Sequence, residues 1–245
     1  MIGRQLPPTI TPATAEQAWG ALGRAHAAVR AAAPTRETLA SLTAQWALET
    51  GWGKQMRCHN IGNVKATDRW DGDYSYFATS ERLSAAAARS ALERAGQRTD
   101  GSGPDVAVPD WSESAGKVRV LFYPSHRACK FRAFGSLDEG AASQVRTLVT
   151  SFPTTLPDLD SGNPDAWARA LHRARYYTAD PDAYAAALAQ IHADLMRRGL
   201  PLPSGAAPPQ PGSPPAPPAS PPAPPGDLTG AALACALAAF LGFAK

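Results

Sequence analysis

Glu49 is the residue whose position in this sequence most favours acid catalysis. It lies in the run AQWALETGWGK, residues 44–54, near the end of a helix predicted over about 35–50 and halted by Gly51. On a helical wheel it falls at the edge of an apolar face formed by Leu39, Leu42, Thr43 and Trp46. Partial burial at that edge raises the pKa of a carboxyl and keeps it protonated near neutral pH. Glu49 is therefore a candidate proton donor to a leaving oxygen, and a solvated Glu at the end of an amphipathic helix is the competing interpretation.

The elements that would position Glu49 are mostly helical. Thr14 and Gln17 form a capping-box pattern, which opens an Ala-rich helix that reaches about residue 33. Further helical periods cover about 84–95, 137–149, 165–174 and 181–198, and β-type runs cover 74–78, 117–123 and 129–134. Strands and helices do not alternate as they do around a parallel sheet. We therefore expect a mainly helical domain with a small antiparallel β lobe.

A proline-rich stretch divides the chain. Residues 201–225 hold 13 of the 24 prolines, so 1–200 is predicted to be one domain and 201–227 an extended linker. The tail, 228–245, contains 17 uncharged residues over 228–244, with small residues at every fourth position from Gly230 to Gly242. This pattern favours an apolar helix that docks in a protein partner or in a membrane.

Composition says little about the partner but excludes some classes. The net charge of +3 is weak and the basic residues do not cluster, so nucleic acid is not expected. The amino-terminal run MIGRQLPPTITPATAEQAW lacks the apolar core of a secretory signal. A substrate outside the cytoplasm would then have to be reached by another route.

Three cysteines leave two questions open. Cys58 and Cys129 could form a disulfide in an oxidising compartment, and together with His59 and His126 they could offer zinc ligands. Adjacent ligands such as Cys58 and His59 rarely reach one metal, so we expect neither metal nor cofactor. A thiol nucleophile at Cys58 is a further alternative, although Cys58 follows a Gly-rich turn rather than starting a helix.

Five runs in order resemble the family-73 glycoside hydrolases, the glucosaminidases that include the wall-cutting domain of flagellar rod-cap proteins. They are AQWALETGWGK, HNIGNVKA at 59–66, FATSERL at 77–83, KFRAFGSLDEG at 130–140 and RYYTADPDAYAAALAQI at 175–191. The resemblance covers roughly residues 35–195 and implies a lysozyme-like α+β fold. It also implies that Glu49 is the catalytic acid, Glu81 the second carboxylate and Tyr176 the groove tyrosine.

Two departures from the family pattern concern the β lobe. An insertion over about 82–116 replaces a short hairpin return, and Phe134 stands where the family's F-R-x-Y segment has tyrosine. The second role therefore has three competitors, Glu93, Asp71 and Asp73. Asn60 and Lys65 match the family's N-x-F-G-I-K segment, although the order around Gly62 and Asn63 differs, and both are candidate substrate-binding residues. The aromatic side chains of Trp52, Trp70 and Tyr176 are candidates for stacking on sugar rings, with core packing as the alternative.

The resemblance implies hydrolysis of the GlcNAc-β-1,4-MurNAc bond in peptidoglycan glycan strands. Glu49 would protonate the glycosidic oxygen. Glu81 would then activate water, with the two carboxyls roughly 6.5 to 9.5 Å apart, or the substrate's own acetamido oxygen would attack. The alternatives are a muramidase or lytic transglycosylase on the same fold, and a non-catalytic wall-binding or structural module. With no signal, a linker and an apolar tail, the enzyme is expected to be made in the cytoplasm and to reach the wall or periplasm in a phage particle or through an injection machine.

Overall fold

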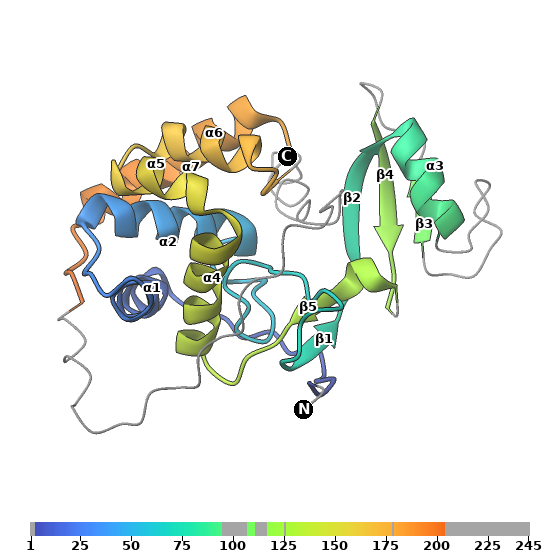
Figure 1. The fold of residues 1–245 in the computed structure, drawn as a ribbon, viewed down its shortest axis with the longest axis horizontal. Coiled ribbons are helices and arrows are strands. Elements are labelled where there is room, and N and C mark those ends of the chain that lie inside the picture. The colour runs from blue at the N-terminus through green and yellow to red at the C-terminus, as the bar shows by residue number, and fades with distance from the viewer. Residues whose placement is uncertain (1–2, 95–106, 111–116, 125, 178, 204–245) are drawn as a thin grey trace.

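The computed structural model describes residues 3–94, 107–110, 117–124, 126–177 and 179–203 (Figure 1). A helical body lies beside a small strand lobe. The helices of the body are α1 (Ala15–Arg30), α2 (Arg36–Thr50), α4 (Leu137–Ser151), α5 (Leu156–Asp160), α6 (Pro164–Arg173) and α7 (Pro181–Arg198). The predicted class, a mainly helical α+β fold with an antiparallel β lobe, is confirmed. The predicted tail, and the linker beyond residue 203, lie outside the described residues.

Local signals set the helix ends. Thr14 and Gln17 form the predicted capping box at the start of α1, and the Thr35 hydroxyl accepts the Thr38 N–H at the start of α2. The helix α2 ends at Gly51, whose φ of +57° is the left-handed conformation that stops helices. Asp180 caps α7, with proline in its first turn.

The central helix of the body is α2, which packs against α1, α5 and α7. Every residue from Thr38 to Thr50 is buried. The wheel predicted one apolar face with Glu49 at its edge, and this was wrong in extent. Ser41, Thr43 and Gln45 occupy buried positions although their side chains are polar. A helix covered on all sides places its last carboxyl inside the protein rather than at a surface edge.

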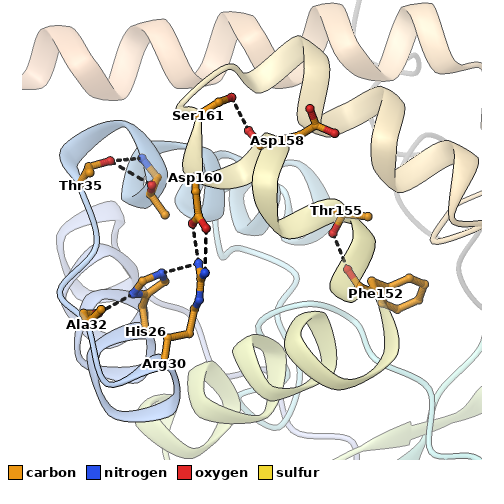
Figure 2. A network of polar contacts seen from close by, with 10 residues as sticks. His26, Arg30, Ala32, Thr35, Phe152, Thr155, Asp158, Asp160 and Ser161 are labelled. Atoms are coloured by element: carbon orange, nitrogen blue, oxygen red, sulfur yellow. Dashed lines mark hydrogen bonds and ion pairs between the residues drawn. The ribbon is translucent and has the colours of Figure 1, made fainter.

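A charged clamp joins the end of α1 to α5 (Figure 2). The guanidinium of Arg30 donates two hydrogen bonds to the Asp160 carboxylate, at 2.5 and 2.7 Å. The neighbouring His26 ring contacts the Ala32 carbonyl at 2.9 Å, and its burial lowers the His26 pKa. This clamp holds α1 and α5, two of the helices that enclose α2.

The β lobe contains two antiparallel sheets. The strands β1 (Tyr74–Tyr76) and β5 (Lys130–Arg132) form one sheet, and β2 (Thr79–Ser84), β4 (Lys117–Phe122) and β3 (Ala107–Asp110) form the other in the order β2-β4-β3. The predicted insertion supplies the end of β2, the helix α3 (Ala85–Arg94) and β3. It therefore enlarges the second sheet, which carries α3 against it (Figure 1). The lobe has a small apolar core of its own, formed by Ala88, Leu92, Val118, Val120, Phe122 and Cys129.

Two chain segments attach to this framework at the domain's ends. Near the amino terminus, the Leu6 N–H bonds to the Tyr74 carbonyl and the Tyr74 N–H bonds to the Arg4 carbonyl, so the segment runs along β1. At the other end, the Trp19 indole donates to the Pro201 carbonyl at 2.8 Å, and Pro203 lies against Gly23. Contacts with the helical body therefore extend at least to residue 203. Among the helices described here, none is long and apolar enough to cross a membrane.

Candidate active site

Glu49 lies in the last turn of α2, and its side chain is inside the protein. The residue is 6% exposed, and burial raises its pKa to about 8. The Tyr184 hydroxyl, from α7, lies 3.4 Å from Oε1 and opposes part of that rise. The other oxygen, Oε2, is buried and has no hydrogen-bonding partner among the described residues. This environment favours a carboxyl that stays protonated at neutral pH.

The backbone that follows Glu49 is unusually rich in left-handed residues. Gly51, Trp52 and Gly53 have φ of +57°, +57° and +77°, and Cys58, His59 and Asn63 lie at +48°, +53° and +48°. A side chain at Gly53 would collide with the Ala13 carbonyl, because its Cβ would lie 2.3 Å from that oxygen. The Asn63 amide donates to the Glu49 carbonyl at 2.5 Å and ties this loop to the end of α2. Backbone strain of this kind tends to gather at functional sites.

Asn60 has a positioning part in the same loop. Its amide donates to the carbonyls of Val64 and Arg132, and its oxygen accepts the Val64 N–H. Asn60 is buried, so these contacts use its side chain to shape the loop. Its polar atoms bond to the protein's own backbone, and direct substrate binding by Asn60 stays a prediction.

Tyr176 belongs to a buried polar chain beside Glu49. Its hydroxyl accepts from the Gln144 amide at 3.0 Å, and the same amide donates to Gln45 at 2.8 Å. Burial raises the pKa of Tyr176, with the Glu49 carboxyl as a further cause. Gly62 makes room for this chain, since a Cβ there would lie 2.0 Å from the Gln144 oxygen. Tyr176 is therefore near Glu49, but it is buried in the body.

Glu81 lies on β2, in the lobe, and its carboxylate forms an ion pair with a lysine. Its carboxylate is 3.7 Å from the Lys65 ammonium. The Lys65 side chain is 7% exposed, donates to the Ala128 carbonyl and lies 4.2 Å from the Phe131 ring centroid. Lys65, predicted to bind substrate, thus has its ammonium engaged inside the lobe. Of the competitors for the second role, Asp73 is bound to Arg4, at 2.9 Å.

The two candidate tryptophans are half-buried and contact protein groups. Trp52 meets Trp46 edge to face at 6.4 Å between centroids, and the Arg198 guanidinium lies 4.8 Å from its ring. Trp70 donates to the Asp73 carbonyl at 2.9 Å, and Arg132 lies 4.3 Å from its ring. Phe134 packs against Trp70, at 6.0 Å between centroids. Stacking of either tryptophan on sugar stays a prediction.

Of the described cysteines, Cys58 and Cys129 are both buried and are not joined by a disulfide. The Cys58 thiol donates to the Pro7 carbonyl. The His126 ring accepts the Ala128 N–H, which points it at the backbone. In the part of the chain that the structure describes, no three His, Cys, Asp or Glu side chains gather as metal ligands would.

Sequence reasoning missed three contacts at this site: the Tyr184 hydroxyl on Glu49, the Gln144 chain, and the Lys65–Glu81 pair. Tyr184 lies within the run 175–191 that carries the family resemblance, but only Tyr176 was singled out there. Glu49 and Tyr184 are 135 residues apart, so no local pattern joins them.

A buried carboxyl with a raised pKa is one kind of group that general acid catalysis can use. The sequence matches the Glucosaminidase family, described as mannosyl-glycoprotein endo-beta-N-acetylglucosaminidase, over residues 25–197. The chain therefore belongs to the glucosaminidase family, and it is a glycosidase.

Comparison with solved structures finds a peptidoglycan hydrolase and the catalytic domain of an autolysin. A peptidoglycan hydrolase from Sphingomonas sp. A1 is 22% identical, with 80% of this chain and 97% of that chain covered and a TM-score of 0.43. The catalytic domain of the autolysin Auto from Listeria monocytogenes is 13% identical, with 79% and 91% covered and a TM-score of 0.40. Comparison with curated proteins finds no match.

Proposed function

We propose that this glycosidase is a peptidoglycan hydrolase that cleaves the GlcNAc-β-1,4-MurNAc bond, with Glu49 as the general acid. The observation that carries the proposal is the burial of Glu49, which raises its pKa to about 8. At pH 7 most of the enzyme then holds the proton that the glycosidic oxygen must receive. A solvated carboxyl with the usual pKa would have lost that proton.

Two routes complete the reaction. Glu81 could remove a proton from the attacking water, or the substrate's 2-acetamido oxygen could attack first. The first route inverts the anomeric carbon in one displacement, and the second retains its configuration through two. The Lys65 ammonium supports the first route, because it holds a carboxylate at a defined place on β2. Proton NMR of the first product formed would distinguish the routes by its anomeric configuration.

Peptidoglycan is favoured over other polymers of N-acetylglucosamine by the five motif runs, which resemble wall-cutting members of the family. The family description also names mannosyl-glycoproteins, whose cleaved bond joins two N-acetylglucosamine units. This is the rival substrate. The two share the sugar that donates the anomeric carbon, and they differ in the sugar that leaves.

Mass spectrometry of the material released from purified sacculi tests this function. We expect muropeptides with a reducing-end GlcNAc from the unmodified protein and none from Glu49→Gln, which keeps the side chain's shape but cannot donate the proton. A high-mannose glycoprotein serves as the parallel substrate and should stay intact. Reducing-end MurNAc or anhydro-MurNAc products would identify a muramidase or a lytic transglycosylase and would overturn the proposal.

The route to the wall is a separate proposal. We propose delivery in a phage particle or through an injection machine, with the apolar run 228–244 docked in a protein partner or a membrane. The support is the sequence of the linker and tail. Flotation of the full chain with liposomes and co-purification of partners test it, and a tail that is dispensable in both assays would contradict it.

A further inference from the structure

We propose that Tyr184 is a positioning residue for the general acid: its hydroxyl holds Oε1 of Glu49, so Oε2 is the oxygen that carries and releases the proton. The inference rests on the proposed function of Glu49. Nothing in the sequence resemblance singled out this tyrosine. Its support is the arrangement of α2 and α7, which bring the two side chains together in the buried interior.

The position of the Tyr184 ring is fixed by the capped helix α7, which carries it, and by a stacked neighbouring ring. Asp180 caps the first turn of α7 by accepting the N–H groups of Asp182 and Ala183, at 3.0 and 2.9 Å. One face of the ring stacks on Tyr177, with 3.9 Å between centroids and 20° between planes. The Tyr184 side chain is 1% exposed. The ring fixed in this way places its hydroxyl 3.4 Å from Oε1 of Glu49, with the Gln45 side chain as its other polar neighbour, and in this proposal its proton points toward Oε1.

The two oxygens of Glu49 therefore differ. A phenol that donates to Oε1 makes that atom an acceptor, so the acidic proton of the neutral carboxyl resides on Oε2. Burial keeps the phenol itself protonated, because it raises the pKa of Tyr184 well above its usual value. Oε2 is buried and has no partner among the described residues. A buried O–H without an acceptor is costly, and the glycosidic oxygen of a bound glycan would supply that acceptor.

In the proposed reaction, each bond, electron pair and proton can be followed from Glu49 to the products. The bond between the anomeric carbon and the glycosidic oxygen breaks, both electrons go to that oxygen, and it takes the proton from Oε2. Glu49 is left as a carboxylate, to which the Tyr184 hydroxyl bonds more strongly than to the neutral acid. Water adds hydroxide to the anomeric carbon, and its remaining proton restores the protonated enzyme. Tyr184 thus stabilises the form of Glu49 that appears during the reaction.

The test is Tyr184→Phe, which keeps the ring and its stack and removes only the hydroxyl. We expect kcat to fall about tenfold, less than the loss from removing the acid itself, with KM within about twofold. We also expect the alkaline limb of the kcat/KM profile to move to higher pH, because the lost donor no longer favours the carboxylate. A purely structural tyrosine would not move that limb.

Tyr177→Phe is the matched control. It removes the hydroxyl of the stacked neighbour, which donates to the Ala168 carbonyl at 3.0 Å. Its kcat and its alkaline limb should stay at the values of the unmodified enzyme. Site-specific replacement of Tyr184 by a difluorotyrosine gives a second, folded probe, since a stronger donor should move the limb to lower pH.

An unchanged kcat and an unmoved limb in Tyr184→Phe would overturn the inference, and so would the same change in both phenylalanine variants. If Glu49→Gln is inactive while Tyr184→Phe behaves like the unmodified enzyme, only the inference about Tyr184 fails. If Glu49→Gln keeps its activity, the proposed function fails as well.

Discussion

Glu49 in the helical body and Glu81 in the β lobe are two carboxyls in opposite surroundings. The Glu49 side chain is buried where α2 meets α7, and the Tyr184 hydroxyl is the one hydrogen-bonding partner of its carboxyl among the described residues. Glu81 is more exposed, at 17%, and faces a buried lysine ammonium. In the proposed mechanism the body would supply the proton donor, and the lobe a carboxylate that lies beside a lysine ammonium. Pairs of carboxyls in environments of this kind divide acid and base roles in glycosidases.

Substituting each carboxyl by its amide tests this division. Glu49→Gln should lower kcat by at least about 10²-fold, because general acid catalysis contributes about 10² to 10⁴. Glu81→Gln should cost a comparable factor if Glu81 activates water, and much less if the acetamido oxygen attacks. Turnover is measured on purified sacculi, with wall binding as the control that both variants should keep. Near-normal turnover in Glu49→Gln would remove the basis of the comparison.

The burial of Glu49 should cost stability in a pH-dependent way. In the unfolded chain its carboxyl ionises near its usual pKa, about 4.5, whereas the folded protein holds the proton to about pH 8. Stability therefore falls as pH rises between those values, because only the unfolded state releases the proton. Glu49→Gln should relieve this cost, by on the order of 2 to 4 kcal/mol at pH 8 and by almost nothing near pH 4.5. Chemical denaturation at the two pH values measures it, and a difference that is the same at both would contradict the expectation.

The Lys65–Glu81 ion pair in the lobe should contribute more to the free energy of unfolding than an exposed ion pair does. Lys65→Met should lower stability by about 2 kcal/mol, because it leaves the Glu81 carboxylate without its counter-ion in a partly buried site. Lys65→Arg should restore most of that loss. Arg4→Met, which breaks the exposed pair with Asp73, is the matched control and should leave the melting temperature nearly unchanged. Equal losses from Lys65→Met and Arg4→Met would show that the Lys65 pair is no more than a surface contact.

Truncation at the carboxyl-terminal end of the domain is expected to have the smallest effect on stability. Deleting residues 204–245 should leave stability and the activity on sacculi unchanged, because a proline-rich linker is not expected to share a core with the domain that precedes it. Deleting 201–245 should instead lower stability by about 1 kcal/mol, since the Trp19 indole loses the Pro201 carbonyl. Thermal melts of the two truncated proteins distinguish them. A large loss in the shorter deletion would mean that the linker or tail contributes to the domain.

Features of this fold that are set by residues close together in the sequence could be predicted, and features set by contacts between distant segments could not. Capping residues such as Thr14 and Thr35 act within one helical turn, so the helix starts were predicted well. The strand β3 was missed because it is only four residues long. It also contains Pro109, and a proline in a short run is more typical of a loop than of a strand. The full burial of α2 was missed because polar residues such as Ser41 and Gln45 indicate an exposed face, although neighbouring helices cover them.

In the candidate site, too, the local motif was predictable and the long-range contacts were not. Glu49 could be singled out as a candidate because its run of residues is local and distinctive. The contacts that set its chemistry come from Tyr184 on α7 and Gln144 on α4, far along the chain, and only folding brings them together. Lys65 was predicted to bind substrate from its place in the segment that resembles the family's N-x-F-G-I-K run, and no local pattern in the sequence indicates that its ammonium lies beside Glu81.

The most direct test of the account is a titration of the Glu49 side-chain carboxyl itself. Proteins labelled with ¹³C at the Glu side-chain carboxyl, with Glu49→Gln as the spectrum that assigns the resonance, can be followed by NMR from pH 3 to 9. The account predicts a midpoint near pH 8, which moves higher in Tyr184→Phe. A midpoint near the usual 4.5 would mean that Glu49 is ionised at neutral pH, and it could not then serve as the proton donor.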